Sequence, residues 1–292
     1  MKVIQEVRKE LKKNSNLAFK KRGVRFFKEP IKVCGVRSNI VRKIAQKYFQ
    51  EIKFNRLNSS KIKRSFNFTG AKEEFFILCE KMLKNDYHEE AIIVFIWTEK
   101  LVKNFDFSDF KTFETWIKKY VNNWGKCDVF CIHTINYFVR NYPLAIPKIK
   151  TWASSKNRWL RRAAAVGFIG SGSNNPKRNS SLRTRNKCGG AATLPTNLPR
   201  CPAAGGDKFI SGSKDFPKKK HLPHIFWIAK KLLKDPDDLV QKGCGWMLKR
   251  AAENFEKEVF NFVMKNKKQM PRTALRYAIE KMPISLKKKA MQ

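Results

Sequence analysis

A tryptophan and an aspartate stand four residues apart near the start of a predicted helix, in the segment VNNWGKCDVFC (121–131). Asn122 or Asn123 can cap this helix, because a short polar side chain accepts hydrogen bonds from the first free backbone N–H groups. At about 100° per residue, Trp124 and Asp128 lie one turn apart on one face. The same face carries three apolar residues, Cys131, Ile132 and Ile135. Two interpretations are open: a functional pocket wall, or plain packing of the indole with the carboxylate complementing the helix dipole.

Two pairs of arginines also stand out. Arg161 and Arg162, in SKNRWLRRAAAV, interrupt a predicted helix that is apolar nearly all round, so they form either a solvated edge or a functional contact. Arg272 and Arg276, in MPRTALRYAIEKMP, lie one turn apart at a predicted helix start, which suits them to gripping a phosphate. Individually, these last two arginines carry little information.

A second tryptophan lies on the polar side of a helix predicted over 237–254. The helical wheel of this segment centres its apolar stripe on Val240, Cys244, Met247, Leu248 and Ala251. Trp246 falls roughly 130° from that centre, beside Lys242 and Lys249. A tryptophan among lysines is an improbable core residue, although it could simply cover a neighbouring loop.

The elements that must position these residues are helical almost everywhere, since apolar residues recur with the helical period. Helices are predicted over 37–53, 72–85, 88–103, 109–120, 124–141, 144–154, 157–169, 224–234, 237–254, 256–268 and 272–282. No convincing strand is found. The sequence therefore predicts an all-α protein, and helices of this length joined by short turns fit a stacked helical-repeat array. A globular bundle is the alternative, because no strict sequence repeat is visible.

The charge of the chain predicts a polyanionic partner. The 292 residues include 63 Lys and Arg against 24 Asp and Glu, giving a formal charge of +39. Such an excess cannot be neutralised internally. Nucleic acid is the first candidate, because each neutralised phosphate releases counterions, and a membrane surface is the second. A soluble basic protein from an organism with a basic proteome is the remaining interpretation.

The seven cysteines and the longest apolar run indicate in which cellular compartment the protein is expected. An odd cysteine count without a secretory signal predicts reduced thiols and an intracellular, cytoplasmic location. The apolar run at 91–97 is far too short to cross a bilayer. Cys127, Cys131 and His133 resemble a metal-ligand cluster, but His133 points away from Cys131 on the helix, so no metal site is predicted.

One stretch, 171–221, breaks the helical pattern. It is dense in Gly and Pro, and no acidic residue occurs from 171 to 206. Such a composition cannot bury enough apolar surface to offset the entropy of ordering, so we expect this stretch to be disordered or loosely held. It is either a genuine basic insertion or a segment that is not native coding sequence, such as a frameshifted or unspliced piece.

Taken together, these segments resemble the AlkD-type DNA alkylation repair enzymes, monofunctional DNA glycosylases built from HEAT-like helical repeats. The resemblance covers about 15–170 and 224–283. It rests on five stretches, RFFKEPIKVCGVRSNIVRKIAQKYF, VNNWGKCDVFCIHTI, WASSKNRWLRRAAAV, DPDDLVQKGCGWMLKRAAE and MPRTALRYAIEKMP. It implies one helical-repeat domain made of 1–170 and 222–292, interrupted by the 171–221 insertion where the family has a short turn. Its concave basic face would bind DNA.

The resemblance also implies roles for the residues above. Trp124 and Asp128 match the W-x-x-x-D motif that lines the family's catalytic pocket, and Trp246 matches a second pocket tryptophan. Arg162 matches an arginine that holds DNA beside the lesion. We add Arg161, Lys242, Lys249, Arg272 and Arg276 as expected phosphate contacts.

The implied activity is hydrolysis of the N-glycosidic bond of cationic N3- or N7-alkylated purines in duplex DNA, which leaves an abasic site for base excision repair. No metal or other cofactor, no membrane and no second subunit is implied, so we expect a monomer acting on alkylated double-stranded DNA. The alternatives are a non-catalytic helical-repeat nucleic-acid-binding protein, a scaffold for protein partners, or an inactive copy of the glycosylase disrupted by the insertion.

Overall fold

A computed structural model describes residues 2–59, 68–170 and 216–292. Most of the predicted insertion, 171–215, lies outside these residues, so the predicted disorder of that stretch and the domain division that depends on it stay predictions.

The described chain is mostly helical, which confirms the all-α prediction. Its α-helices are α1 (Lys2–Lys13), α2 (Leu17–Phe26), α3 (Ser38–Ser59), α4 (Phe68–Leu83), α5 (His88–Lys100), α6 (Phe110–Tyr120), α7 (Trp124–Phe130), α8 (Asn136–Asn141), α9 (Ala145–Trp152), α10 (Arg158–Val166), α12 (Leu222–Leu232), α13 (Asp238–Ala252), α14 (Glu256–Asn266), α15 (Arg272–Ile279) and α16 (Ile284–Met291). Short 3₁₀ turns cover Val102–Asn104, Phe107–Asp109, Lys219–His221 and Lys267–Gln269. Within this part of the chain no strand forms beyond a single bridge between Lys32 and Tyr87.

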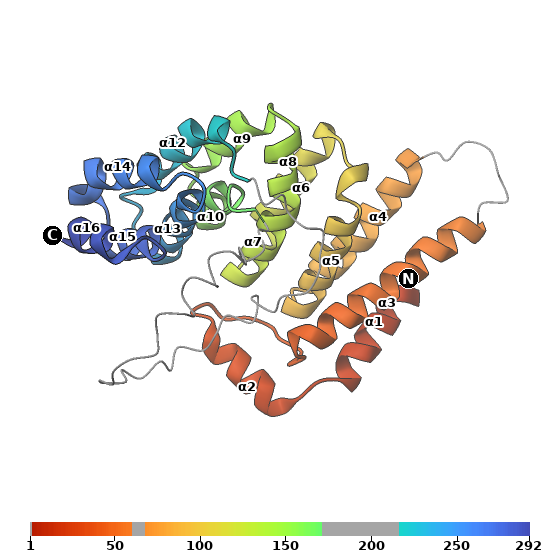
Figure 1. Ribbon diagram of the computed structural model, residues 1–292. Coiled ribbons are helices and arrows are strands. Elements are labelled where there is room, and N and C mark those ends of the chain that lie inside the picture. The colour runs from red at the N-terminus through yellow and green to blue at the C-terminus, as the bar shows by residue number, and fades with distance from the viewer. Residues whose placement is uncertain (1, 60–67, 171–215) are drawn as a thin grey trace, which may run out of the picture.

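The helices stack side by side into a curved array (Figure 1). In the C-terminal two thirds, α8, α9, α12 and α14 form one layer, along the upper edge of the view. Helices α7, α10, α13 and α15 form a second layer beneath it. Helix α10 packs against both α7 and α13, so it stands at the centre of the second layer. We refer to these as the outer and inner layers.

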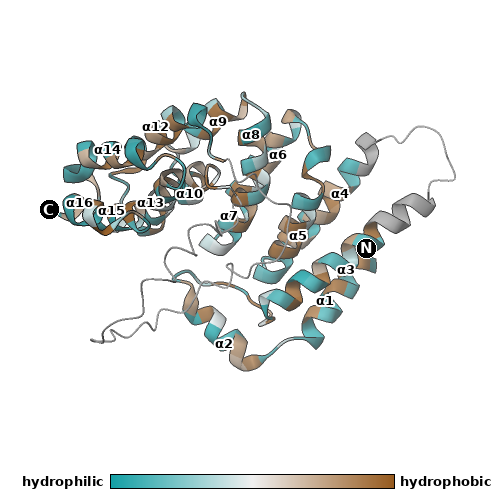
Figure 2. Cartoon of the chain, viewed as in Figure 1, coloured by the Kyte–Doolittle hydropathy of each residue, from teal (hydrophilic) through white to brown (hydrophobic). Residues whose placement is uncertain are grey.

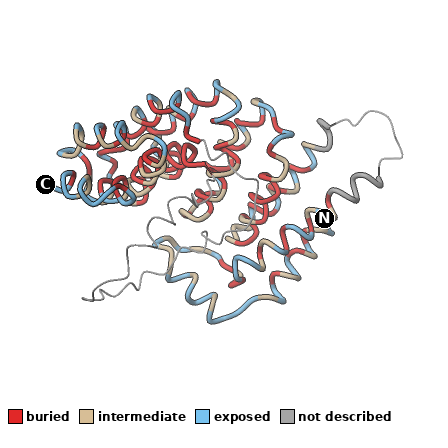
Figure 3. The backbone as a smooth tube through the Cα atoms, in the orientation of Figure 1, coloured by how far each residue is buried: buried red, intermediate tan, exposed pale blue. Residues whose placement is uncertain are grey.

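The apolar stripes of the helices face one another between the layers, as the burial and hydropathy patterns show (Figures 2 and 3). The predicted stripe of α13 is buried at every position, namely Val240, Cys244, Met247, Leu248 and Ala251. Exposed polar residues lie on the opposite faces of the helices. Periodicity alone therefore gave the correct inward faces for most of the array.

Three helices were not predicted from the sequence, namely α1, α2 and α16. Helix α1 packs through only Ile4, Val7 and Leu11. Helix α2 has no buried residue, and its first turn is held by Asn16, whose side chain accepts a hydrogen bond from the Phe19 N–H. The buried residues of α1 have the helical spacing i, i+3, i+7, so its burial follows the same periodicity rule as the rest of the array.

The predicted helix over 124–141 is divided by a π-helical turn, Cys131–Ile135, between α7 and α8. Such turns arise where one extra residue is accommodated in a helix, and a residue pattern of period 3.6 does not reveal them. Helix α13 also begins later than predicted. Asp237 caps it by accepting from the Leu239 and Val240 N–H groups, so the first helical residue is Asp238.

The segment after α2 is anchored to α5 by a buried carboxylate. Glu89 is 4% exposed and accepts hydrogen bonds from the backbone N–H groups of Cys34, Gly35 and Val36, at 2.8, 2.8 and 3.2 Å. Gly35 has φ of +83°, a conformation that side-chain-bearing residues rarely adopt. This anchor fixes the N-terminal segment beside the start of α7. None of the described helices is long and apolar enough to cross a membrane.

Candidate functional site

The W-x-x-x-D motif lies in the first two turns of α7, as predicted. Asn123 is the capping residue: its side chain accepts from the Lys126 N–H at 2.9 Å. Trp124 is the first helical residue and half-buried, whereas Asp128, one turn later, is only 5% exposed. The two side chains thus share one face of a capped helix, with the aspartate the deeper of the two.

Asp128 forms a two-point ion pair with Arg162 of α10. Arg162 Nε donates to Asp128 Oδ1 at 2.8 Å, and Nη2 donates to Oδ2 at 2.7 Å. The remaining nitrogen, Nη1, donates to the backbone carbonyl of Leu239 at the start of α13. Arg162 is itself 5% exposed. These three residues therefore join α7, α10 and α13 through buried polar bonds, and we refer to them as the inner junction.

Burial raises the pKa of the Asp128 carboxyl above its ordinary value, and the Arg162 guanidinium opposes that shift. Since arginine stays protonated in proteins, its parallel N–H groups favour the ionised carboxylate. Arg162 donates one hydrogen bond to each Asp128 oxygen, and each carboxylate oxygen has a second lone pair. The inner junction therefore holds a fixed, desolvated carboxylate with a second acceptor position on each oxygen.

Trp124 packs against two phenylalanines at the end of α2. Its ring centroid lies 5.4 Å from that of Phe26 and 5.3 Å from that of Phe27. Phe27 in turn lies 5.3 Å from the ring of His88, the first residue of α5. Burial lowers the pKa of His88 to about 4, and the Lys126 charge adds to that shift. The side chains packed behind the tryptophan of the motif are therefore apolar or uncharged.

Beneath the same turn lies a buried lysine. Lys126 is 1% exposed, and its Nζ pairs with Asp86 Oδ1 at 2.7 Å. Asp86 adopts φ of +63°, which favours Asp and Asn among side-chain-bearing residues, and it also accepts from Asn122 at 2.8 Å. Burial lowers the pKa of Lys126, although Asp86 opposes the shift. This pair fixes the start of α7 to the turn before α5.

Trp246 lies on α13, the helix that also supplies the Leu239 carbonyl. It is half-buried and packs against the core edge. Among the described aromatic contacts, Trp124 meets Phe26 and Phe27 but not Trp246. The structure thus brings Asp128 together with Arg162, whereas the two tryptophans of the expected pocket are not in ring contact.

Two glycines around Trp246 set the spacing of α13. A Cβ on Gly243 would lie 3.3 Å from Arg162 Nη1, so this glycine leaves room for the guanidinium. A Cβ on Gly245 would lie 2.5 Å from Tyr277 Cβ and 2.6 Å from the Ala274 carbonyl oxygen. Gly245 therefore permits the close packing of α13 on α15, which fixes the position of its neighbour Trp246.

Most of the cations expected to contact phosphate are paired with carboxylates of the protein. Arg161 pairs with Asp235 at 2.5 Å, Lys242 with Asp238 at 3.1 Å, and Lys249 with Glu280 at 2.9 Å. Only Arg272 and Arg276 of the expected set are exposed and without an ion pair among the described residues. Phosphate binding through the first three would require exchange of a carboxylate for a phosphate.

Sequence reasoning missed a group of ion pairs that ties the N-terminal segment to α13. Arg158 contacts Glu29 Oε1 at 3.0 Å and Asp237 Oδ2 at 2.8 Å. Lys28 pairs with Asp238 at 2.7 Å, across 210 residues of sequence. A sequence signal for these pairs is the acidic run DPDD (235–238), because three carboxylates within four residues of so basic a chain indicate cation partners.

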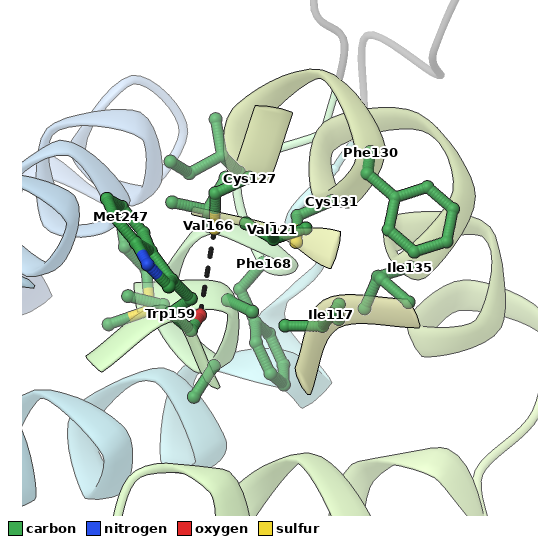
Figure 4. Close-up of a cluster of buried hydrophobic side chains, with 14 of the residues drawn as sticks. Ile117, Val121, Cys127, Phe130, Cys131, Ile135, Trp159, Val166, Phe168 and Met247 are labelled. Atoms are coloured by element: carbon green, nitrogen blue, oxygen red, sulfur yellow. Dashed lines mark hydrogen bonds between the residues drawn. The ribbon is translucent and has the colours of Figure 1, made fainter. Parts of the chain in front are cut away.

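The cysteines of the motif helix are structural. Cys127 Sγ donates weakly to the Trp159 carbonyl at 3.7 Å, and both sulfurs of the helix lie among buried apolar side chains (Figure 4). His133 bonds instead to Glu99 at 2.8 Å. Within the described residues no cluster of three or more His, Cys, Asp or Glu could hold a metal ion.

Comparison with known proteins agrees with this architecture. The profile of the family described as "DNA alkylation repair enzyme" matches residues 7–185 and 210–282. A solved structure of a predicted DNA alkylation repair enzyme from Enterococcus faecalis superposes with a TM-score of 0.62 at 12% identity, covering 93% of this chain and 98% of that one. The structure of smu.31 from Streptococcus mutans UA159 superposes with a TM-score of 0.45 at 17% identity, covering 86% and 97%. No curated protein sequence matches.

Fold and site together define an all-α array of stacked helices with a buried carboxylate at the centre of its inner layer. The chain belongs to the DNA alkylation repair enzyme family. The family match is interrupted between 185 and 210, inside the stretch predicted as an insertion.

Proposed function

We propose that this protein is a DNA glycosylase that hydrolyses the N-glycosidic bond of cationic N3- or N7-alkylated purines in duplex DNA. The observation that carries the proposal is the fixed carboxylate of Asp128, held by Arg162 one turn from Trp124. Family membership supports DNA as the substrate.

The chemistry needs little from the protein beyond a well-placed negative charge. Alkylation leaves the base positively charged, so the electrons of the C1′–N bond can leave with it and give a neutral free base. Positive charge then develops on the deoxyribose, and water adds to C1′ and releases a proton. Asp128 stabilises the charge that appears only in the transition state, which is the stabilisation that accelerates a reaction. It can also orient the attacking water or accept its proton.

Trp124 and Trp246 would add their π-faces to the cationic base or sugar, for about 0.5–2 kcal/mol each. Arg272 and Arg276, exposed and unpaired among the described residues, are suited to backbone phosphates. For Arg162 we propose a different role from the DNA contact expected from the resemblance: each of its three nitrogens already donates a hydrogen bond within the inner junction, so it positions Asp128.

The test is release of 7-methylguanine or 3-methyladenine from methylated duplex DNA by the purified chain. Wild-type protein should release base, and Asp128→Asn should lose most of that release while keeping its affinity for DNA. Because Asp128→Asn also disturbs the inner junction, thermal melting must accompany the assay. Trp246→Ala, at a half-buried position, provides a second variant that should lower release without unfolding the chain.

A non-catalytic nucleic-acid-binding protein is the second candidate, and the observation that favours it is the 5% exposure of Asp128. In that case wild-type protein and Asp128→Asn would both bind DNA and neither would release base. Equal release by both would instead refute the role of this carboxylate. Deleting 171–215 distinguishes an active enzyme from a disrupted copy, because a disrupted copy gains activity when the stretch is removed.

A further inference from the structure

The outer layer carries a second basic region that the proposed glycosylase reaction does not use. Helices α8, α9 and α12, with the 3₁₀ turn before α12, contain no Asp or Glu, because the sequence lacks both from 129 to 206 and from 216 to 234. These elements, together with Lys218 directly before the turn, carry eight cations, Arg140, Lys148, Lys150, Lys218, Lys219, Lys220, Lys230 and Lys231. We call these residues the outer basic surface.

The eight cations differ from Arg161, Arg162, Lys242 and Lys249 of the inner layer because no ion pair is formed by any of the eight within the described chain. Seven of the eight are exposed, and Lys150 is half-buried. Helix α9 packs against α8 and α12, and α12 continues from the 3₁₀ turn, so the cations belong to adjoining elements (Figure 1). Unpaired cations without neighbouring carboxylates produce a positive potential that attracts a polyanion.

An exposed tryptophan lies within this surface. Trp227 of α12 is 37% exposed, whereas Trp97, Trp116, Trp152 and Trp159 are each buried. Lys150 Nζ lies 5.1 Å from the Trp227 ring centroid and Lys231 Nζ lies 5.8 Å from it. An indole flanked by two ammonium groups can stack on an unpaired base while the lysines contact the adjoining phosphates.

A small basic cavity lies at the other end of the same surface. It encloses about 160 Å³ and is lined by Arg140, Asn141, Phe216, Lys218, Lys220 and His221. Burial lowers the pKa of His221 to about 4, and the charges of Lys220, His224, Lys218 and Arg140 add to this shift. The cavity lining therefore supplies cations, an amide and no carboxylate, which suits an anionic group such as a phosphate.

We propose that the outer basic surface binds a single-stranded segment of nucleic acid, with an unpaired base stacked on Trp227. Lys150 and Lys231 would contact the phosphates beside that base, and the cavity at Arg140 and Lys218 would hold a further phosphate of the strand. Single strands are favoured over duplex because stacking on an exposed indole requires a base that is free of its own stack. This site is separate from the inner junction and does not depend on the proposed catalytic reaction.

The first experiment titrates the full chain with a labelled oligothymidylate of about twelve nucleotides, within the range of lengths that single-strand-binding folds cover. Trp227→Ala should weaken binding by roughly five- to a hundred-fold, and Trp227→Phe should retain most of the affinity because it keeps an aromatic face. Leu144→Ala is the matched control, since Leu144 is another exposed apolar side chain of the outer layer. Thermal melting checks that each variant is folded.

A second experiment separates local charge from net charge. The double variant Lys150→Glu/Lys231→Glu should weaken oligothymidylate binding more than Lys288→Glu/Lys289→Glu on α16, which changes the net charge equally. Binding of Trp227→Ala within twofold of wild type would overturn the proposal, and so would equal effects of the two charge reversals. An equal loss of affinity for duplex DNA in Trp227→Ala would overturn its single-strand character.

The same titration distinguishes this proposal from the proposed catalytic function. Asp128→Asn should bind oligothymidylate as wild type does, because Asp128 is buried in the inner junction. If wild-type protein failed to release alkylated bases yet lost strand affinity on Trp227→Ala, the outer site would stand and the glycosylase proposal would fall. If wild-type protein released alkylated bases but Trp227→Ala kept its affinity for the single strand, only the outer-site proposal would be overturned.

Discussion

The inner junction and the outer basic surface place cations in opposite physical settings. Arg162 is 5% exposed and bonded to Asp128 and Leu239, so its charge is committed to the protein. The cations beside Trp227 are largely exposed and form no described ion pair, so their charge is available to a ligand. Charge at the inner junction should therefore govern stability and the geometry of the site, whereas charge on the outer basic surface should govern binding and its dependence on salt.

The largest effect expected from this difference is loss of stability in Arg162→Ala. Removing the guanidinium leaves Asp128 buried without its partner, which typically costs about 3–5 kcal/mol. Urea denaturation should show this loss, and Lys150→Ala on the outer basic surface should change stability by no more than about 0.5 kcal/mol. The double variant Asp128→Leu/Arg162→Met, which removes both charges, should recover much of the loss. Similar stabilities for Arg162→Ala and Lys150→Ala would remove the distinction between the two regions.

The second prediction concerns pH. Burial lowers the pKa of His88 to about 4, below the value of about 6.5 in an unfolded chain. The unfolded state therefore binds the extra proton first, so the contribution of neutral His88 is present above pH 6.5 and is lost as pH falls toward 4. At about 1.4 kcal/mol per pKa unit, the loss approaches roughly 3 kcal/mol. His88→Leu should flatten the fall in stability measured by denaturation between pH 6.5 and 4. An unchanged slope would show that His88 does not stay neutral beside Phe27.

The array of helices was predictable because its signal is local. Periodic apolar residues gave α3 to α6, α9, α10 and α12 to α15 with ends displaced by a few residues, since each stripe is read within one segment. The same reasoning gave the motif face of α7 but could not reveal the π-helical turn that follows. Helix α2 was not predicted, and it buries no residue in the folded chain.

The partners of the site residues were not predictable, since they depend on tertiary contacts. Asp128 and Arg162 lie 34 residues apart, and Leu239 lies 77 residues beyond Arg162. Sequence reasoning recognised both charged residues as anomalies on apolar faces but assigned Asp128 to the catalytic pocket and Arg162 to the DNA. The pairing follows from the packing of α10 between α7 and α13, which a single sequence does not specify.

The third prediction tests how rigidly the inner layer holds Trp246. A Cβ on Gly245 would lie 2.5 Å from Tyr277 Cβ and 2.6 Å from the Ala274 carbonyl oxygen, so Gly245→Ala should force α13 and α15 apart. We expect a loss of about 1–3 kcal/mol and a larger exposed fraction of Trp246. Gly23→Ala is the control, because its Cβ would meet only Val33 at 4.0 Å and alanine favours a helix. Denaturation curves and tryptophan fluorescence of the two variants measure both effects. Equal stabilities would mean that the inner layer adjusts as easily as the exposed helix α2.

The smallest expected effect is on the salt dependence of binding to single strands. This salt dependence distinguishes the outer basic surface from the inner layer most directly. Lys148 is exposed and without a described ion pair, so its replacement by alanine should remove about one phosphate contact and reduce the slope of log K against log salt by about 0.7. Lys28 is already paired with Asp238, so Lys28→Ala leaves that carboxylate with Lys242 as its remaining partner and leaves the outer basic surface intact. Its slope for oligothymidylate should match that of wild type. A larger change for Lys28→Ala than for Lys148→Ala would place the single strand near Lys28 and α13, and not on the outer basic surface.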